Sequence, residues 1–404
     1  MMEAAQTLVS SYCFPPYSDT AGIVAAKRVR ETGEPVDVIT NSMDGLRERD
    51  SSLTELAGDL VRRYGAVASP PHFASWKSVR SFVHSGGEVV DRWESEQGPY
   101  SKIYSRAHFI ASHYLAAARK IARPDVEWTA EFSDPLSHDS LGRPRVSPMR
   151  DDDLTEQLRQ ALRSVGRSAP HSRNAHEWCE VVAFALADTL VFTNAIQRDF
   201  MLERCHDEAL AHSALERSVI MPHPTLPREF YELGHSTYAL DPARVNIGYF
   251  GNFYANRGVG LLFEAVAGLP RALVDKIAIH VFTNSPQDLS DAAAAAGVAS
   301  RFRINPYVDY LEFLALADRM DLLLINDAVA PPGMPNPFLP SKWSDYAGST
   351  TPVWAILQEG STLDSLGGFA LATPVEHTSG LQQALVKLAL HGAPARPRVA
   401  GDHR

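Results

Sequence analysis

Ser341, Lys342 and Asp345 carry the most suggestive spacing of polar side chains in the chain, in the stretch NPFLPSKWSDYAGSTTPVWAI. Pro340 fits the first turn of a helix, so Ser341 and Lys342 are expected at its positive end. Backbone N–H groups, a hydroxyl and an ammonium there suit a dianion such as a pyrophosphate. Asp345 follows one turn later on the same face, where a carboxylate can bind both hydroxyls of a ribose. The alternative is a surface Lys–Asp pair, although the lysine precedes the acid, which is the less favourable order.

A second anion site is predicted in IGYFGNFYANRGVGLLFEA, residues 247–265. An apolar strand ends at Phe250, Gly251 permits a tight turn, and Arg257 stands before a helix, where a guanidinium favours an anion. The spacing GxGxxG of dinucleotide-binding loops and the P-loop pattern GxxxxGK[ST] are both missing from the sequence, which disfavours those two classes. The alternative is an ordinary turn glycine with a solvated arginine.

A third loop follows the strand-like run RFRI and precedes a helix that begins at about Asp309 or Tyr310. Backbone groups near Tyr307 and Val308 could meet the edge of a nucleobase there. A purely structural turn is the alternative.

The elements that must position these residues alternate between apolar strands and helices from residue 245 onward. Such alternation predicts a parallel, doubly wound sheet, in which ligands bind beyond the carboxyl ends of the strands. The N-terminal half shows a looser version of the pattern, with a helix expected at 20–32, and 404 residues exceed one comfortable core. We therefore expect an α/β protein with two Rossmann-like domains facing a cleft, 1–235 and 236–391, and a disordered tail, 392–404.

Composition narrows the function classes. A formal charge of −10 disfavours nucleic acid as a partner. Cys13, Cys179 and Cys205 are scattered and form no CxxC pair, so neither disulfides nor a cysteine zinc site is indicated. The start has no signal-like segment, and no apolar run reaches about 18 residues. These features predict a cytoplasmic protein whose contact with a membrane is at most peripheral, and "DDDL" at 151–154 is interpreted as a helix start.

The three loops together resemble the nucleotide-sugar-binding domain of glycosyltransferases with the B-type fold. The similarity is greatest to the large retaining family that includes bacterial cell-surface and lipid mannosyltransferases, and it is strongest over 245–372. This resemblance implies that Gly251 and Arg257 hold the donor diphosphate, with Asn252 where a partner arginine often stands. It also implies that Asp345 replaces the second of two glutamates eight positions apart. Pro337 stands in place of the first, and Asp327 is the nearest upstream acid.

The N-terminal half resembles the acceptor-side domain of such enzymes more loosely, in FPPYSDTAGIVAAKRV and in LADTLVFTNAIQRDFML followed by IMPHP. The family commonly uses a histidine there to contact the donor sugar, and His108 and His113 are the candidates. If the reaction inverts the anomeric centre, Asp19, Glu131 or Asp134 would act as the base on the acceptor hydroxyl. With 15 histidines in the chain, a structural role is the alternative for each.

The function that this resemblance implies is transfer of a sugar from a nucleoside diphosphate sugar to an acceptor hydroxyl, with retention. Arg257, Lys342 and helix dipoles would stabilise the leaving diphosphate, without a cofactor or an essential metal. The acceptor would be a glycan, a lipid-linked molecule or a small molecule, and the oligomeric state stays open. Two alternatives remain: a nucleotide-sugar epimerase or hydrolase of the same fold, and a non-catalytic nucleotide-sugar-binding subunit, which the missing first acid favours.

Overall fold

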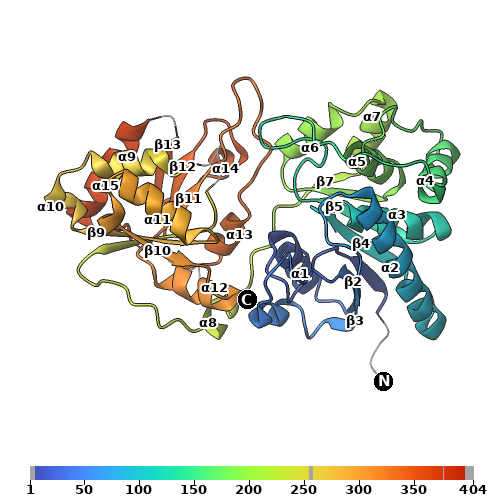
Figure 1. Ribbon diagram of the computed structural model, residues 1–404, viewed down its shortest axis with the longest axis horizontal. Coiled ribbons are helices and arrows are strands. Elements are labelled where there is room, and N and C mark those ends of the chain that lie inside the picture. Colours follow the sequence, from blue (N-terminus) through green and yellow to red (C-terminus); the bar gives the residue numbers. More distant parts are fainter. Residues whose placement is uncertain (1–4, 254–257, 376, 396–404) are drawn as a thin grey trace, which may run out of the picture. The chain divides into compact units, whose positions relative to one another are not determined.

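The computed structural model describes residues 5–253, 258–375 and 377–395. The chain divides into two compact units, Met1–Pro224 and Thr225–Arg404 (Figure 1). Each unit has a parallel β-sheet of its own with helices on its faces. Within the described ranges, no helix is both long enough and apolar enough to span a membrane.

The sheet of unit 1 has the strand order β3-β2-β1-β4-β5-β6-β7, and all of its pairs are parallel. Its strands are β1 (Thr7–Ser10), β2 (Val36–Asn41), β3 (Val61–Val67), β4 (Lys102–Ala107), β5 (Glu127–Phe132), β6 (Thr189–Phe192) and β7 (Ser218–Ile220). Its helices are α1 (Thr20–Thr32), α2 (Trp76–Gln97), α3 (Ala111–Ala122), α4 (Asp153–Ser164), α5 (Ala175–Leu186), α6 (Ala195–Leu202) and α7 (Glu208–Glu216), with the 3₁₀-helix η1 (Ser51–Leu56).

The sheet of unit 2 has the order β10-β9-β8-β11-β12-β13, again parallel throughout. Its strands are β8 (Val245–Phe250), β9 (Ile277–Thr283), β10 (Phe302–Pro306), β11 (Leu322–Asn326), β12 (Val353–Leu357) and β13 (Leu371–Pro374). Its helices are α8 (Phe230–Leu233), α9 (Gly260–Ala267), α10 (Arg271–Val274), α11 (Pro286–Ala295), α12 (Tyr310–Arg319), α13 (Lys342–Ala347), α14 (Thr362–Leu366) and α15 (Thr378–His391), with the 3₁₀-helix η2 (Ala299–Arg301).

Local sequence signals set the ends of several elements. The Asp19 carboxylate accepts a hydrogen bond from the Ala21 N–H at 2.9 Å and so caps α1, which ends at Gly33 in the left-handed conformation. The predicted helix at 20–32 has the bounds of α1. In unit 2, every residue of β9, β11 and β12 is buried, as expected for strands covered on both faces.

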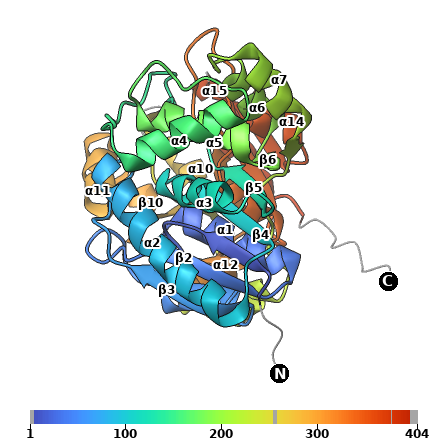
Figure 2. The ribbon, with the colours of Figure 1, turned by 90° about the vertical axis from the view of Figure 1, so that its right-hand side faces the viewer.

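Helices α2 and α3 pack side by side on unit 1 (Figure 2). At their crossing, a Cβ atom on Gly86 would lie 3.0 Å from Leu115 Cδ2, so the small residue permits the close approach. The long α2 was not anticipated, because two consecutive glycines, Gly86 and Gly87, interrupt its helical pattern.

Each strand order reverses direction at one point, between β1 and β4 in unit 1 and between β8 and β11 in unit 2. In open α/β sheets such a switch point opens a crevice at the carboxyl ends of the strands, and ligands bind there. Ligand-binding residues are therefore expected in the loops that follow β1, β4, β8 and β11.

The segment 225–235, which the predicted boundary near residue 235 assigns to the first domain, packs in unit 2. Arg228 donates to both carboxylate oxygens of Asp318, at 2.8 and 2.5 Å. Tyr231 donates to the backbone carbonyl of Asp345. Of the predicted tail 392–404, residues 396–404 lie outside the described part of the chain.

Candidate functional site

The switch point of unit 2 brings Gly251 and Lys342 together. Gly251 follows β8 with φ +144°, and a Cβ atom on it would lie 2.5 Å from Lys342 Nζ. Lys342 is the first residue of α13, and its Nζ lies 3.8 Å from the centroid of the Tyr249 ring. This cation–π contact directs the ammonium toward the turn after β8 without neutralising its charge.

Asn252 ties three strand-end loops together. Its Oδ1 accepts hydrogen bonds from Tyr307 Oη at 2.8 Å, from Thr283 Oγ1 at 3.0 Å and from the Asn284 N–H at 3.1 Å. The loops after β8, β9 and β10 are thereby held side by side. The Tyr307 side chain is exposed, whereas Val308 packs against a buried cluster. The structure thus places Asn252 with Tyr307, two residues predicted for different parts of a nucleotide.

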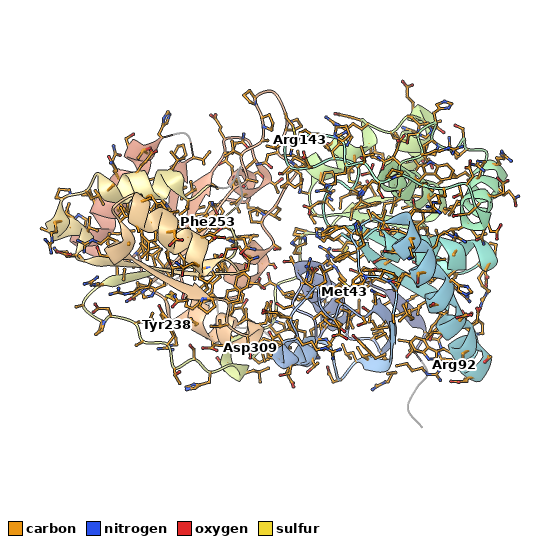
Figure 3. The ribbon with its side chains drawn as sticks, viewed as in Figure 1. Met43, Arg92, Arg143, Tyr238, Phe253 and Asp309 are labelled. Atoms are coloured by element: carbon orange, nitrogen blue, oxygen red, sulfur yellow. The ribbon has the colours of Figure 1, made fainter. Side chains whose placement is uncertain are left out.

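Phe253, labelled in Figure 3, stacks on Tyr249 with ring centroids 4.2 Å apart. Tyr249 also donates a hydrogen bond to the Asn252 carbonyl at 3.1 Å. The turn after β8 therefore holds the Tyr249 ring in place, and Lys342 Nζ lies over this ring. Arg257, the predicted guanidinium of this loop, lies outside the described residues.

Asp345 is buried one turn beyond Lys342. One of its carboxylate oxygens accepts a hydrogen bond from Tyr310 Oη at 2.5 Å. Burial, and then the negative charge of Asp345, hold the pKa of Tyr310 well above its ordinary value, so the phenol stays a donor. Ser341 lies immediately before α13, and its carbonyl accepts from the Ser344 N–H at 3.1 Å and from Ser344 Oγ at 2.9 Å.

No acid stands between Asp327 and Asp345 in the sequence, so the stretch around Pro337 supplies none in place of the missing one. Asp327, the nearest upstream acid, is buried and accepts hydrogen bonds from the Gln358 N–H at 3.0 Å and from Ser361 Oγ at 2.6 Å. Asn336 donates to the Ala328 carbonyl at 2.7 Å. These bonds give Asp327 a role in holding the loop.

The switch point of unit 1 brings His108 close to Asp134, with Nδ1 and Oδ2 4.0 Å apart and both side chains about 30% exposed. Burial lowers the pKa of His108, while the charges of Asp19 and Asp134 act in the opposite direction. Asp19 is engaged twice, because it caps α1 and accepts from Arg47 Nε at 2.7 Å. His108 and Asp134 are thus the accessible members of this group.

His113 lies apart from His108, inside the layer between α3 and the sheet. Its Nδ1 and Ser105 Oγ are 2.8 Å apart, and it packs edge-on against Trp128 and Phe132. Burial lowers the pKa of His113 to about 3, and the charge of Arg106 contributes. This geometry is that of a core histidine.

Glu131 is fully buried in a network of charges on the other face of the sheet. It accepts hydrogen bonds from Arg28 Nε at 3.0 Å and from Tyr104 Oη at 2.9 Å, and Arg106 Nε lies 3.4 Å away. Arg106 Nη2 lies 3.1 Å from His223 Nε2. Glu131 is thus buried and paired with two arginines, which is the setting of a structural acid.

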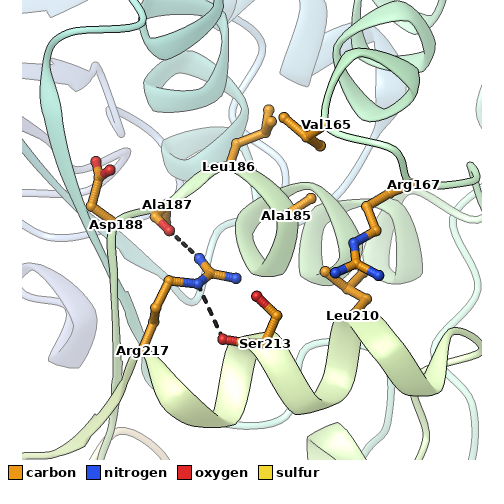
Figure 4. A pocket seen from close by; sticks show the side chains of 9 residues that line it. All are labelled: Val165, Arg167, Ala185, Leu186, Ala187, Asp188, Leu210, Ser213 and Arg217. Carbon is orange, nitrogen blue, oxygen red and sulfur yellow. Dashed lines mark hydrogen bonds between the residues drawn. The ribbon is translucent and has the colours of Figure 1, made fainter.

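A pocket of about 340 Å³ lies elsewhere on unit 1, at the amino ends of β6 and β7 (Figure 4). The C-terminal ends of α4, α5 and α7 line it, and such ends carry negative partial charge. Arg217 donates to the carbonyls of Phe184 and Ala187 at the end of α5 and to that of Ser213 on α7. The arginine therefore supports the helices, and the pocket lies at the sheet edge opposite to His108.

In the described ranges, no group of three or more His, Cys, Asp or Glu side chains has the geometry to hold a metal ion. The residues that sequence reasoning missed are Tyr249 and Tyr310, which position Lys342 and Asp345. The sequence offered a signal for both, since Tyr249 lies near the end of β8 and Tyr310 begins α12, each beside a predicted ligand-binding loop.

Comparison with known proteins finds no matching family profile and no matching curated protein. Solved structures do match over nearly the whole chain. The catalytic domain of starch synthase IV from Arabidopsis thaliana, bound to ADP and acarbose, has a TM-score of 0.59 at 11% identity, covering 96% of this chain and 92% of that one. The UDP-forming α,α-trehalose-phosphate synthase from Burkholderia xenovorans, in complex with glucose-6-phosphate, has a TM-score of 0.57 at 11% identity, covering 95% and 92%.

A UDP-GlcNAc 2-epimerase from Neisseria meningitidis, bound to UDP-GlcNAc, is also similar, with a TM-score of 0.52 at 9% identity and coverage of 95% and 91%. The chain thus has the B-type glycosyltransferase fold, which confirms the predicted fold class. That fold is shared by nucleotide-sugar glycosyltransferases and by epimerases that act on nucleotide sugars.

Proposed function

We propose that this chain is a glycosyltransferase that moves a sugar from a nucleoside diphosphate sugar to an acceptor hydroxyl. The observation that carries the proposal is the Lys342 ammonium, held over Tyr249 and against Gly251 at the switch point of unit 2. A cation at that place suits the diphosphate of a nucleotide. The similar structures bound to ADP and to UDP-GlcNAc support the same ligand class.

In this proposal the parts of the donor are divided among the loops of unit 2. Lys342 and Ser341 bind the diphosphate together with Gly251 and Arg257, Asp345 binds the ribose, and Tyr307 and Val308 lie beside the base. Asn252 acts by joining the loops. As the glycosidic bond breaks, negative charge grows on the diphosphate, so a pre-positioned ammonium lowers the barrier.

On unit 1, His108 and Asp134 are the proposed groups for the reacting sugar and the acceptor hydroxyl. They are accessible at the carboxyl ends of β4 and β5, and their opposite charges favour each other when His108 is protonated. Retention of configuration, cytoplasmic location and the nature of the acceptor are proposals that follow from the family resemblance.

The proposal is tested by calorimetry with UDP, GDP, ADP, CDP and dTDP. We expect one of them to bind, and Lys342→Ala to weaken it roughly 10- to 100-fold, since a hydrogen bond to a charged group contributes about 1.5–3 kcal/mol. Lys276→Ala is the matched control, because this exposed lysine precedes β9 at the opposite sheet edge. If no nucleotide binds, or if Lys342→Ala binds as tightly as the wild type, the donor site is wrongly placed.

An epimerase is the second candidate, favoured by the similarity to the UDP-GlcNAc 2-epimerase structure and by Pro337 in place of an acid. The two activities separate when the nucleotide sugar that binds is incubated without an acceptor. A transferase leaves it intact or hydrolyses it slowly, whereas an epimerase converts it to a second sugar that NMR detects.

A further inference from the structure

Phe73 presents an exposed aromatic ring at the carboxyl edge of the sheet in unit 1. It lies in the loop between β3 and α2, and its side chain is 40% exposed. The ring stacks on Phe109, with centroids 4.6 Å apart. It packs edge-to-face with His108, with ring centroids 4.5 Å apart. Single exposed apolar residues are common, but this one is set among aromatic and polar neighbours.

The loop that carries Phe73 is held firmly in place. Asn41 Oδ1 accepts from the Ser69 N–H at 2.8 Å and from Ser69 Oγ at 2.7 Å. His72 Nδ1 accepts from the Ala74 N–H at 3.2 Å and from the Ser75 N–H at 2.9 Å. Hydrogen bonds on both sides of Phe73 therefore fix its backbone, which lowers the entropy that a ligand would lose on binding.

Polar groups adjoin the exposed side of this ring system. His108 touches Phe73 and lies 4.0 Å from Asp134, and both polar side chains are about 30% exposed. A flat apolar surface thus borders a carboxylate and an imidazole within one accessible patch. Apolar surface with a few convergent polar groups is the usual composition of a small-molecule site.

A pyranose ring has the matching chemistry, with C–H bonds on one face and hydroxyls around its rim. C–H groups with partial positive charge favour the negative face of an aromatic ring. The rim hydroxyls can donate to the Asp134 carboxylate and exchange hydrogen bonds with His108. A lipid chain would use the aromatic ring but would leave both polar groups without a partner.

We propose that Phe73 is the platform on which a pyranose acceptor stacks, with its hydroxyls toward His108 and Asp134. This inference rests on the proposed transferase function and gives it a substrate class: the acceptor is a carbohydrate. Phe73 contacts the acceptor and has no part in donor binding.

The test is saturation-transfer NMR of the full chain with the methyl glycosides of glucose, galactose, mannose and N-acetylglucosamine. We expect transfer to the ring C–H protons of at least one glycoside, a loss of five-fold or more in Phe73→Ala, and retention in Phe73→Trp. Leu215→Ala is the matched control, because Leu215 on α7 is an apolar side chain of similar exposure, 43%. Nucleoside diphosphate affinity should be the same in all four proteins.

Three results overturn the proposal. The first is a wild type that binds a nucleoside diphosphate but no glycoside, and the second is a glycoside signal that survives Phe73→Ala; both leave the proposed function standing. The third is transfer from the protein to the alkyl chain of n-octyl glucoside, below its micelle concentration, without transfer to the sugar ring. Failure of every nucleotide to bind would instead count against the transferase function itself.

Discussion

An aromatic ring and the backbone of a glycine help to position the charged side chain of Lys342. Its ammonium lies over the Tyr249 ring and against the backbone of Gly251. An aromatic face orients an ammonium without taking up its charge, which suits a lysine that is to bind a phosphate. The position of the ammonium therefore depends on the absence of a side chain at residue 251.

Gly251→Ala should weaken nucleoside diphosphate binding about ten-fold or more, because the added methyl group lies 2.5 Å from Lys342 Nζ and must displace it. The positive φ of +144° adds backbone strain of about 1–3 kcal/mol in a non-glycine residue. Calorimetry and urea unfolding measure the two effects. Gly87→Ala, on α2 of unit 1, is the control, since a Cβ there meets no atom within 4 Å. Equal loss of affinity in both variants would contradict the close packing of Gly251 on Lys342.

His113 makes the stability of unit 1 depend on pH. Its pKa is lowered by burial from 6.5 to about 3, so the folded state holds it neutral while the unfolded state takes up a proton below pH 6.5. The stabilisation is therefore complete above pH 6.5 and is lost as the pH falls toward 3. At pH 5 the loss amounts to about 2 kcal/mol, from 1.4 kcal/mol for each pH unit.

The measurement is urea unfolding at pH 7.5 and pH 5.0 in the wild type and in His113→Gln. We expect the variant to be less stable at pH 7.5 but to lose less on acidification. His84→Gln is the control, since that histidine is exposed on α2 and its Nε2 lies 3.5 Å from a Glu88 carboxylate oxygen. The same acid sensitivity in wild type and His113→Gln would show that His113 is not the group that titrates.

At the scale of elements, the short helix α8 is joined to unit 2 through Asp318 on α12. This carboxylate accepts from Arg228, from the Thr350 N–H at 2.7 Å and from Ser349 Oγ at 3.1 Å. These bonds outweigh the effect of burial and lower the pKa of Asp318 to about 2. One side chain thus holds α8, α12 and the loop before β12 together.

Asp318→Asn should destabilise unit 2 by about 2 kcal/mol at pH 7, since the folded pKa lies about 2 units below the ordinary value of 3.8. The sign follows from the lowered pKa: the stabilisation is present above pH 3.8 and is lost as the pH falls toward 2. Urea unfolding at pH 7 measures it. Glu359→Gln, at an exposed acid after β12, is the control and should change little; an equal effect would mean that Asp318 holds nothing together.

Elements with strong local signals were predicted well from the sequence, and those formed by packing were not. The cap residues of α1 and the apolar run of β8 are local, so 20–32 and the strand before Gly251 were placed correctly. Helix α2 was missed because Gly86 and Gly87 interrupt its helical pattern, and the packing of Gly86 against Leu115 of α3 cannot be read from one segment. Likewise, Lys342 was predicted as a diphosphate ligand from its place at a helix N-terminus. Its contact with Tyr249 could not be predicted without knowing that β8 and β11 are neighbours in the sheet.

At the scale of the whole molecule, two Rossmann-like units with the B-type fold arise from a sequence that matches no family profile. The alternation of strands and helices predicted the two Rossmann-like units, because each βα unit must bury its apolar face against a parallel sheet. The B-type fold was implied by the resemblance of the three loops. The domain boundary is less local. Segment 225–235 is held in unit 2 by Arg228 and Tyr231, whose partners lie 90 and 114 residues away in sequence.

The two units should respond differently to the donor, which binds unit 2 in our proposal. A ligand that binds only the folded form stabilises it by about 2.7 kcal/mol at 100 times its dissociation constant. Hydrogen exchange with the nucleoside diphosphate present should therefore slow in peptides that cover 245–253 and 341–347, and more weakly across β9, β11 and β12. The sheet of unit 1 should exchange at its unliganded rate, and Lys342→Ala should abolish the protection. Protection confined to unit 1 would place the nucleotide on the sheet that carries His108, and the donor and acceptor roles of the two units would have to be exchanged.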